Sequence, residues 1–595
     1  MSRQKPQGCA FLIEEIGFEE IFTPEKFSED QQMFAETAEN FIKKEVDPIV
    51  DELEKKDFDK MAKLLRKSAE VGLTMIDIPE EYGGLGVDKT TSMVVTERLS
   101  TYSSWATTYG AHTGIGMLPL LYFGTAEQKQ KWLPKIASTE VIAAYALTEP
   151  GSGSDALAAK TRAELSDDGE HYVLTGKKMW ITNAGFADLF TVFAQVDGDK
   201  FTAFLVEGDR EGISLGAEEK KMGLRGSSTR EVNLEGVKVP VGNLLGEIGK
   251  GHKIAFNILN IGRFKLGVGS LGGGKRALEV ATKFALQREQ FGQPIAEFGA
   301  IRSKLASMAT QLYSLESMCY RVAGYMDRNL EILDSNAEDY PQQAIKAIEE
   351  FAIEDSIIKV FGSETLDFVA DEAVQIHGGL GYSAEYEVER IYRDTRINRI
   401  FEGTNEINRM LIPGMILKRT MKGQLNLFDQ IQKVELALTE GAKPTPPPQD
   451  DDPELAFERF VTEQSKKIGV YCANQAIQKH MADLREQQEI LIDLADIISQ
   501  LYVMDSTVSR TLQLIESDGF EATEVHRAAT RIALAEAFQI VRQRGERLLY
   551  NLADGEELNA HLEAFEKLSF YPRIDVISLS RIVADAVTAR ERYPF

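Results

Sequence analysis

Apolar and polar positions follow a helical period over most of the chain. In EDQQMFAETAENFIKKEVDPIV the apolar residues Phe34, Ala38, Phe41 and Ile42 recur at helical spacing, with polar and charged residues between them. Turns such as IPEEYGGLG interrupt the pattern between about residues 30 and 143. The period returns in longer segments from 252 to 420 and from 455 onward, which predicts an antiparallel helical bundle followed by further helices.

Between about 145 and 250 the period changes to that of strands. The segments HYVLTGKKMWITNA, DLFTVFAQV, FTAFLVE and REVNLEGVKVP are short, rich in Val, Phe, Thr and Tyr, and separated by Gly and Asp turns. Such segments are typical of antiparallel strands. The sequence therefore predicts a small β domain between two helical regions.

These patterns predict a mainly α protein with a central β domain. The expected parts are an N-terminal extension (1–29), an N-terminal helical domain (30–143), a middle antiparallel β domain (144–251), a helical-bundle domain (252–420), a linker (421–454) and a C-terminal helical domain (455–595). The linker is expected from KPTPPPQDDDPE, because proline and acid at this density cannot build a core. A chain of 595 residues is too long for one core, so several domains are expected.

Charge and cysteine content exclude several classes of function. The chain carries 93 Asp and Glu against 67 Lys and Arg, a formal charge of −26, which disfavours binding to nucleic acid or to an anionic membrane. Cys9, Cys319 and Cys472 are far apart and form neither a disulfide framework nor a zinc spacing. The N-terminal apolar run CAFLI (9–13) is too short for a signal-peptide core, and no stretch approaches the ~18 consecutive apolar residues of a membrane span. We therefore expect a cytoplasmic protein without stable membrane insertion and without a metal site.

Two glycine patterns near residue 270 resemble nucleotide-binding loops. GVGSLG (267–272) fits the dinucleotide fingerprint, and GSLGGGK (269–275) nearly fits a phosphate loop. The first lacks the preceding strand of a βαβ unit, and the second has Arg276 where a Mg²⁺-binding Ser or Thr is required. Close packing between helices is the simpler interpretation of both.

Two stretches at the β domain combine hydroxyl groups with an aromatic residue. YALTEPGSGSDA (145–156) places Thr148, Ser152 and Ser154 in a Pro- and Gly-rich loop, which offers hydroxyls and free N–H groups to a polar ligand. In KMWITNA (178–184), Trp180 and Thr182 alternate on a strand and share one face, so an indole and a hydroxyl could meet a flat heterocycle. Taken alone, an ordinary turn and a core tryptophan are the more frequent interpretations.

A third stretch, RDTRINRIFEGTNEINR (393–409), surrounds a carboxylate with apolar and cationic residues. Glu402 lies between Phe401 and Gly403, with Ile400 before them. Most glutamates are solvated at the surface. A glutamate in an apolar pocket has a raised pKa instead, which suits a general base. Glu402 is therefore a candidate catalytic base.

Together with QREQFG (287–292) and QIHGGLGY (375–382), these stretches resemble the acyl-CoA dehydrogenase family of flavoenzymes. ALTEPGSGSDA and QIHGGLGY…RIYRD are similar to the two signatures of the family, and the match is collinear from about 30 to 420. The additional C-terminal helices, and an acid at Glu406, make the chain most similar to the very-long-chain type. The resemblance implies an α-helical domain, a β domain and a four-helix-bundle domain.

The resemblance also implies a role for each stretch. Glu402 would remove the α-proton of an acyl-CoA thioester, while the β-hydrogen leaves as hydride to FAD and trans-2-enoyl-CoA forms. The implied FAD-binding residues are Tyr145, Leu147, Thr148, Gly153, Ser154, Trp180, Thr182, Arg288, Phe291, Gln375, Gly378, Gly379, Thr404 and Glu406. Those from Arg288 to Gly379 would come from the neighbouring subunit. The implied substrate-binding residues are Ser154, Arg263 and Gly403.

The implied partners are an acyl-CoA substrate, an electron-transfer flavoprotein and a second copy of the chain in a homodimer. The family's acyl tunnel would be lined by GAHTGIGMLPLLYFG (110–124), where Gly114 and Gly116 leave room for a long chain and Pro119 stands where a second family glycine is expected. His112 and His377 are expected to be structural. Two alternatives stay open: an acyl-CoA oxidase that uses O₂, and a non-catalytic acyl-CoA-binding scaffold.

Overall fold

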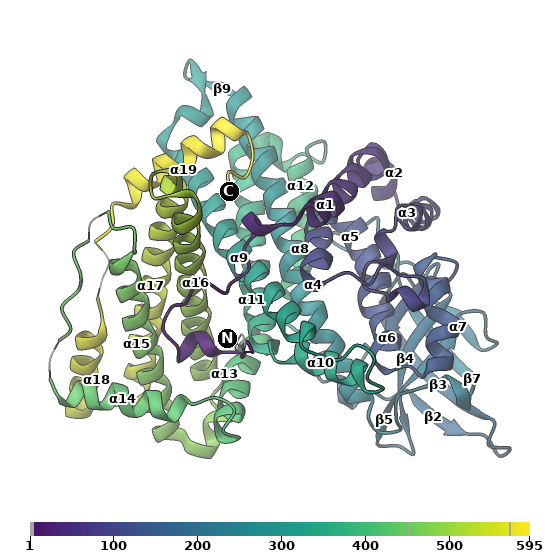
Figure 1. Ribbon diagram of the computed structural model, residues 1–595. Coiled ribbons are helices and arrows are strands. Elements are labelled where there is room, and N and C mark those ends of the chain that lie inside the picture. Colours follow the sequence, from purple (N-terminus) through teal and green to yellow (C-terminus); the bar gives the residue numbers. More distant parts are fainter. Residues whose placement is uncertain (1–4, 442, 450, 571–572) are drawn as a thin grey trace.

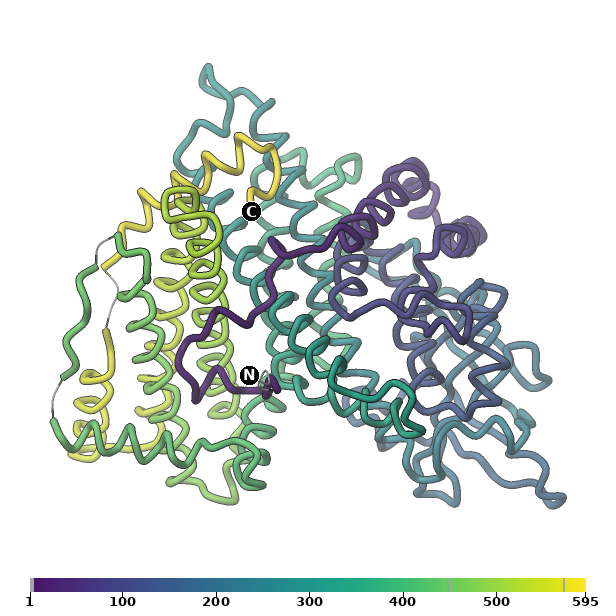
Figure 2. Tube along the Cα trace, viewed as in Figure 1, coloured from purple at the N-terminus to yellow at the C-terminus, as the bar shows by residue number. Residues whose placement is uncertain are grey.

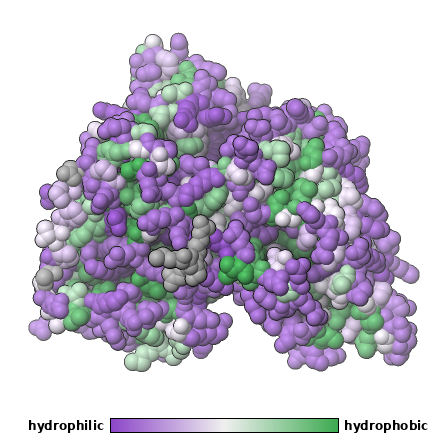
Figure 3. All heavy atoms as spheres, in the orientation of Figure 1, coloured by the Kyte–Doolittle hydropathy of each residue, from purple (hydrophilic) through white to green (hydrophobic). Residues whose placement is uncertain are grey.

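The computed structural model describes residues 5–441, 443–449, 451–570 and 573–595. Residues 1–4 of the expected extension, and Ala442 and Asp450 of the expected linker, lie outside these ranges. Figures 1 and 2 show the N-terminal helices and the sheet on one side, long helices in the centre, and the C-terminal helices on the other side. The face in Figure 3 is mainly hydrophilic, with scattered apolar side chains, as the acidic composition suggests.

The N-terminal region is helical, and polar caps fix the starts of α1, α3, α4 and α7. Ser28 and Gln31 form a capping box at the first helix, and Thr125 and Gln128 form another at the seventh. A turn of π-helix, Ala111–Gly116, interrupts the segment that was expected to line a tunnel. The helices are α1 (Glu29–Phe41), α2 (Val50–Glu54), α3 (Phe58–Glu70), α4 (Lys89–Leu99), α5 (Ser103–Gly110), α6 (Leu118–Phe123) and α7 (Ala126–Ala137).

The middle region is one sheet with the strand order β6-β7-β3-β2-β4-β5-β8, and β1 pairs with β4. Most pairs are antiparallel, as expected, but β1 and β2 both run parallel to β4. Partly alternating burial along β3 and β7 gives this part of the sheet one buried apolar face, whereas β4 and β5 are buried on both faces. The strands are β1 (Ala143–Ala146), β2 (Arg162–Leu165), β3 (His171–Thr182), β4 (Leu189–Val196), β5 (Lys200–Glu207), β6 (Ile213–Leu215), β7 (Thr229–Pro240) and β8 (Leu244–Leu245).

The central bundle is built on one long helix, α8, which runs from Gly251 to Gln287. It lies along α11 in the same direction, since Gly267 in the middle of α8 meets Ile358 near the start of α11, and Phe284 near the end of α8 stacks on His377 at the end of α11. This pair departs from a purely antiparallel bundle, because the long helix α9 returns the chain between them. The other elements are the hairpin β9 (Glu289–Gln290) and β10 (Gln293–Pro294), α9 (Gly299–Glu331), α10 (Tyr340–Glu349), α11 (Ala352–His377), α12 (Glu387–Thr395) and α13 (Asn405–Met421).

The C-terminal region is helical, and its first helix corrects the expected linker. Leu427, Ile431 and Val434 are buried on one face of α14 (Leu427–Thr439), so this part of the expected linker is a packed helix. Of the expected linker 421–454, the described residues of the proline-rich part after Gly441 contain no helix. The remaining helices are α15 (Ala456–His480), α16 (Gln488–Asp518), α17 (Glu524–Leu552), α18 (Gly555–Leu568) and α19 (Val576–Arg590). In the part of the chain that the structure describes, no helix is long and apolar enough to cross a membrane.

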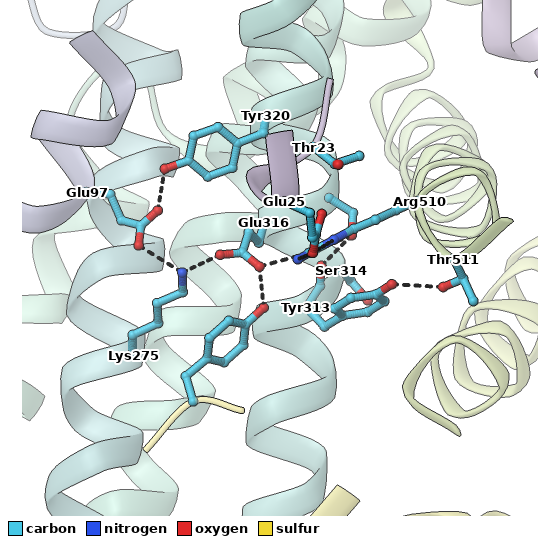
Figure 4. A network of polar contacts seen from close by, with 12 residues as sticks. Thr23, Glu25, Glu97, Lys275, Tyr313, Ser314, Glu316, Tyr320, Arg510 and Thr511 are labelled. Atoms are coloured by element: carbon cyan, nitrogen blue, oxygen red, sulfur yellow. Dashed lines mark hydrogen bonds and ion pairs between the residues drawn. The ribbon is translucent and has the colours of Figure 1, made fainter. Parts of the chain in front are cut away.

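A buried charge network joins the C-terminal region to the bundle (Figure 4). Its members are Glu25, Glu97, Lys275, Glu316, Arg510 and Tyr593. Lys275 of α8 bridges Glu97 of α4, at 2.8 Å, and Glu316 of α9. Arg510 of α16 reaches Glu316 at 2.8 Å and Glu25 of the N-terminal segment at 2.5 Å. The lysine that resembled a phosphate-loop residue is thus a structural cation whose side chain is largely buried, with 14% of it exposed.

Candidate active site

Glu402 lies in a strained turn between two helical elements, η12 (Arg396–Arg399) and α13. Its φ is 56° and that of Gly403 is 78°, so a non-glycine residue is held in the left-handed region. The carbonyl of Glu402 accepts hydrogen bonds from Arg263 Nε at 3.2 Å and from Asn408 Nδ2 at 3.4 Å. Thr404 then caps α13 by accepting from the N–H of Ile407. The backbone of this turn is therefore fixed by specific partners.

A buried lysine holds the other side of the turn. Lys359 of α11 is fully buried, and its Nζ donates to the carbonyl of Gly403 at 2.8 Å and to Asn405 Oδ1 at 2.7 Å. Burial lowers the pKa of Lys359 to about 7, although the charge of Glu402 opposes that shift. Arg263 and Lys359 thus place two cations beside the carboxylate.

The carboxylate of Glu402 is desolvated at the head of a cavity. Its Oε2 is buried without a hydrogen-bond partner among the described residues. Gly262 of α8 faces it so closely that a Cβ there would lie 2.7 Å from Oε2. Burial raises the pKa of Glu402 to about 7, against the opposing effect of Arg263 and Lys359. A carboxylate with such a pKa and an unused oxygen is suited to accept a proton near neutral pH.

The cavity has a volume of about 180 Å³ and is lined mainly by apolar atoms. It lies between α4, α5, the π-helical turn, α8 and α11, with Glu402 and Phe401 at its wall. Gly114 lines it, as expected, but Gly116 does not: a Cβ on Gly116 would lie 2.5 Å from the carbonyl of Ala111. Pro119 is also outside the lining, so it does not limit the depth of the cavity.

A buried ion pair fixes the loop that follows β1. Lys178 of β3 is fully buried and contacts Glu149 at 2.6 Å and the carbonyl of Leu147 at 3.2 Å. The N–H of Met179 donates to the carbonyl of Thr148 at 2.9 Å. The hydroxyl of Tyr145 is buried without a partner in the described chain, and burial together with the charge of Glu402 raises its pKa well above the usual value. The backbone of the loop is therefore held against β3, and Tyr145 of the preceding strand lies close enough to Glu402 to feel its charge.

Trp180 and Thr182 lie at the end of β3, where its pairing with β7 shifts register between Lys178 and Ile181. At this bulge Trp180 has a φ of 57° and its side chain is 58% exposed, which excludes a core role. Thr182 lines the cavity that contains Glu402. An indole left half-exposed beside an accessible hydroxyl fits a flat aromatic ligand on this face.

The remaining candidates of this group lie around the same loop and turn. Leu147 is buried, and Gly153 and Ser154 are exposed at the loop tip. Glu406 is exposed in the first turn of α13, next to the capping Thr404. Arg263 does not extend freely toward a ligand; it is 5% exposed and its guanidinium braces Glu402 and Asn260. Arg263 therefore lies beneath the turn that carries Glu402.

A second group of candidates lies far from the first. Arg288 follows the end of α8, and at 1.5 Å per residue it lies roughly 38 Å along the helix from Gly262. Gln375, Gly378 and Gly379 are at the parallel end of α11, where the stacking of Phe284 on His377 joins the two ends. Phe291, at the hairpin β9–β10, has a φ of 53° and is 96% exposed. One chain therefore does not bring the two groups together.

Both histidines near the site are engaged in structural contacts. His112 donates from Nε2 to the carbonyl of Ile136 and accepts at Nδ1 from the N–H of Ala143, each at 3.1 Å. His377 donates from Nδ1 to the carbonyl of Ala373 at 2.8 Å. Burial lowers the pKa of His112 to about 4, so its ring is neutral. These contacts confirm the structural role expected for both residues.

Sequence reasoning missed three residues that define the site: Gly262, Lys359 and Lys178. Lys359 stands inside an apolar run, IIKVF, and Lys178 directly precedes one, MWI; a buried lysine requires a partner. That signal was available in the sequence. The role of Gly262 was not, because it depends on which face of α8 meets the turn.

Comparison with family models covers most of the chain. Models described as the acyl-CoA dehydrogenase N-terminal domain, middle domain and C-terminal domain match residues 28–140, 144–237 and 249–416. A second model, also described as an acyl-CoA dehydrogenase C-terminal domain, matches residues 464–567. The additional C-terminal helices are thus a known part of some family members.

Relatives and a solved structure agree with the family models. A probable acyl-CoA dehydrogenase of Bacillus subtilis is 48% identical over 99% of this chain and 98% of its own length. The bovine mitochondrial very long-chain specific acyl-CoA dehydrogenase is 39% identical over 74% of this chain and 68% of its own. The crystal structure of an acyl-CoA dehydrogenase complexed with FAD, from Bacillus anthracis, superposes with a TM-score of 0.97 at 47% identity, over 99% of this chain and 100% of that one. The chain belongs to the acyl-CoA dehydrogenase family.

Proposed function

We propose that this member of the acyl-CoA dehydrogenase family removes one hydrogen each from Cα and Cβ of long-chain acyl-CoA thioesters, giving trans-2-enoyl-CoA, with FAD as cofactor. The observation that carries the proposal is the carboxylate of Glu402, desolvated and unpartnered at the head of an apolar cavity. FAD, when bound, supplies the two-electron acceptor for the hydrogen that leaves Cβ. Structures of relatives support this cofactor.

Glu402 is proposed to accept the α-proton of the thioester. Its turn fixes the backbone, and burial keeps the pKa of the carboxyl at about 7, so the ionised base is available near neutral pH. Arg263 and Lys359 hold the turn through the carbonyls of Glu402 and Gly403, and their charges stabilise the carboxylate. Turnover is therefore expected to rise as the pH passes through about 7 from below.

The residues around the base fit the cofactor. Trp180 leaves its indole half-exposed, and Tyr145 has an unpartnered buried hydroxyl within the described chain, which is the pattern of a site that a ligand completes. We propose that this chain holds FAD through Tyr145, Leu147, Thr148, Gly153, Ser154, Trp180, Thr182, Thr404 and Glu406. Ser154 also meets the CoA portion of the substrate, and Gly403 the thioester.

The second group of candidate residues serves the site of a second copy. Arg288, Phe291, Gln375, Gly378 and Gly379 lie too far from Glu402 to reach the same cofactor in one chain. A guanidinium binds pyrophosphate bidentately, and an exposed phenyl ring can cover a heterocycle. We therefore propose a homodimer in which each chain completes the FAD site of the other.

The physiological setting is also a proposal. We propose a role in fatty-acid β-oxidation with an electron-transfer flavoprotein as acceptor, because relatives include the bovine very long-chain enzyme. A cytoplasmic location suits the three cysteines, which are all buried and free. A scaffold without activity would have no need of a strained and desolvated Glu402.

The test is an anaerobic titration of the FAD-loaded protein with hexadecanoyl-CoA and octanoyl-CoA, followed by flavin absorbance. We expect bleaching by hexadecanoyl-CoA and much less by octanoyl-CoA. Glu402→Gln should still bind hexadecanoyl-CoA and octanoyl-CoA, but its turnover should fall by about two to four orders of magnitude. A yellow protein that no acyl-CoA bleaches would refute the substrate assignment. Fast reoxidation of the reduced protein by air would favour an oxidase over transfer to a flavoprotein.

A further inference from the structure

The glycines of α8 fall into two groups with different surroundings. Three of them permit close packing against three neighbouring helices: a Cβ would lie 2.4 Å from Ile358 of α11 at Gly267, 2.0 Å from the carbonyl of Glu97 of α4 at Gly272, and 2.5 Å from Leu312 of α9 at Gly274. Gly262, Gly269 and Gly273 instead line the cavity that contains Glu402. Packing between helices does not require the glycine at 273, because the atom nearest to a Cβ there lies 3.4 Å away, an ordinary van der Waals distance.

The cavity-facing glycines form a stripe along the helix. Leu266 and Ser270 line the cavity between them, so the lining recurs at helical spacing from Gly262 to Gly273. These ends are eleven residues apart, which corresponds to about 16 Å along α8. An extended chain advances about 1.2 Å per bond, because a backbone residue of three bonds spans about 3.5 Å. The stripe therefore accompanies an acyl chain for about thirteen bonds beyond the base.

Near Gly273 the cavity is bounded by α4 and α11, which contribute Ser100 and Leu366 to its lining. A Cβ on Gly273 would lie 3.4 Å from Leu366 Cδ1 and 3.5 Å from the carbonyl of Ser100. A Cβ on Gly269 would lie 3.1 Å from Ser100 Oγ. The hydroxyl of Ser100 donates to the carbonyl of Thr96 at 2.6 Å, so it is satisfied within its own helix. Among the described residues, Ser100 therefore leaves no unsatisfied hydroxyl at this end of the cavity.

Behind this end lies the buried charge network of Figure 4. Lys275 follows Gly273 by two residues, Glu97 precedes Ser100 by three, and the two side chains pair at 2.8 Å. An acyl chain that pushed further would have to separate buried charges, which is strongly unfavourable. The end of the cavity is therefore rigid.

From this geometry we propose that the glycine stripe of α8 sets the longest acyl chain that the protein accepts, with Gly269 and Gly273 as specificity-determining residues. The proposal rests on the proposed function, since it takes the cavity as the acyl site. Because Gly269 and Gly273 have no side chains, the cavity stays wide enough there for an acyl chain. Any side chain at Gly273 occupies the space of the terminal carbons.

The test uses Gly273→Ala and Gly273→Leu in the FAD-loaded protein. Alanine is a better helix former than glycine, so Gly273→Ala is expected to fold at least as well as the parent. Each methylene that is no longer buried costs about fourfold in affinity. Gly273→Ala should therefore weaken hexadecanoyl-CoA about fourfold, and Gly273→Leu, which displaces about three methylenes, should weaken it about sixtyfold. Octanoyl-CoA should be unaffected.

The readout is the ratio of dissociation constants for the two ligands, measured by calorimetry in a Glu402→Gln background where no turnover interferes. Gly414→Ala is the matched control, because Gly414 lies in a helix with open space around its Cβ position and away from the cavity. An unchanged ratio in Gly273→Leu would overturn the proposal, even if the parent bleaches with hexadecanoyl-CoA. A changed ratio supports it, even if the parent dehydrogenates no acyl-CoA, in which case the proposed function alone has failed.

Discussion

The replacement Glu402→Gln is expected to abolish turnover and, at alkaline pH, to stabilise the fold. The carboxyl is buried with one oxygen lacking any partner that the described residues supply, so its ionised form is unfavourable in the folded protein. Its pKa is raised from 4.5 to about 7, with burial as the main cause. Glutamine has nearly the same shape and carries no charge at any pH. The base is thus maintained at the expense of stability.

The sign and the size follow from proton linkage. Between pH 4.5 and about 7 the folded protein binds more protons at Glu402 than the unfolded chain, so stability falls as the pH rises through this window. The loss is complete above about 7 and corresponds to about 3 kcal/mol. Glutamine still buries an amide, which reduces the gain, so we expect about 1–2 kcal/mol in favour of Glu402→Gln at pH 8.5. At pH 4.5 the two proteins should be nearly equal.

The assay is the thermal midpoint at pH 4.5 and pH 8.5, with saturating FAD and a fixed scan rate, because bound ligand and scan rate both shift the midpoint. The matched control is Glu127→Gln at the start of α7. Backbone N–H groups and Thr125 lower the pKa of that exposed carboxyl, so its replacement should slightly lower the midpoint at pH 8.5. An equal difference between Glu402→Gln and the parent at both pH values would refute the argument from burial.

Two further replacements probe the parts of the site that hold the base and the loop. Gly262→Ala would place a Cβ 2.7 Å from the carboxylate of Glu402 and displace it, so turnover should fall more than tenfold while flavin absorbance is retained; an unchanged rate would contradict the observed approach. Lys178→Met leaves Glu149 buried without its cation, which should destabilise the loop that follows β1 by about 3–5 kcal/mol. The ratio of flavin to protein absorbance after gel filtration should then drop, whereas the exposed control Lys177→Met should keep its FAD.

The sequence predicted the fold class well because its period changes twice. Helical spacing around Phe34 and strand-like segments around Trp180 separate the three regions before any contact is known. The linker prediction extended the proline-rich segment near 443 too far toward the N-terminus. It therefore missed α14, although Leu427, Ile431 and Val434 recur at helical spacing. Parallel pairing of β1 with β4 was not predictable, since it depends on contacts between distant segments.

The candidate base could be proposed from local sequence, but its environment could not. Glu402 stands among apolar residues, which already suggested a raised pKa. The cations that brace its turn come from positions 263 and 359 on two other helices, and only the fold brings them together. The same holds for Trp180, whose exposure follows from a bulge that no propensity reveals. Local residue patterns do not report contacts between segments that are distant in the sequence.

The charge network around Glu316 has a consequence for how the protein matures as it is synthesised. Glu316 bonds to Tyr593, which is 277 residues later, and Arg510 bonds to Glu25, which is 485 residues earlier. While the bundle emerges from the ribosome, Glu316 lacks its partners Arg510 and Tyr593, which are synthesised later, and water can still reach it. The segment behind the cavity therefore reaches its final form after the C-terminal helices have docked. In a nascent chain halted before α16, the segment around Glu316 should therefore stay incompletely packed and be cleaved readily by proteases.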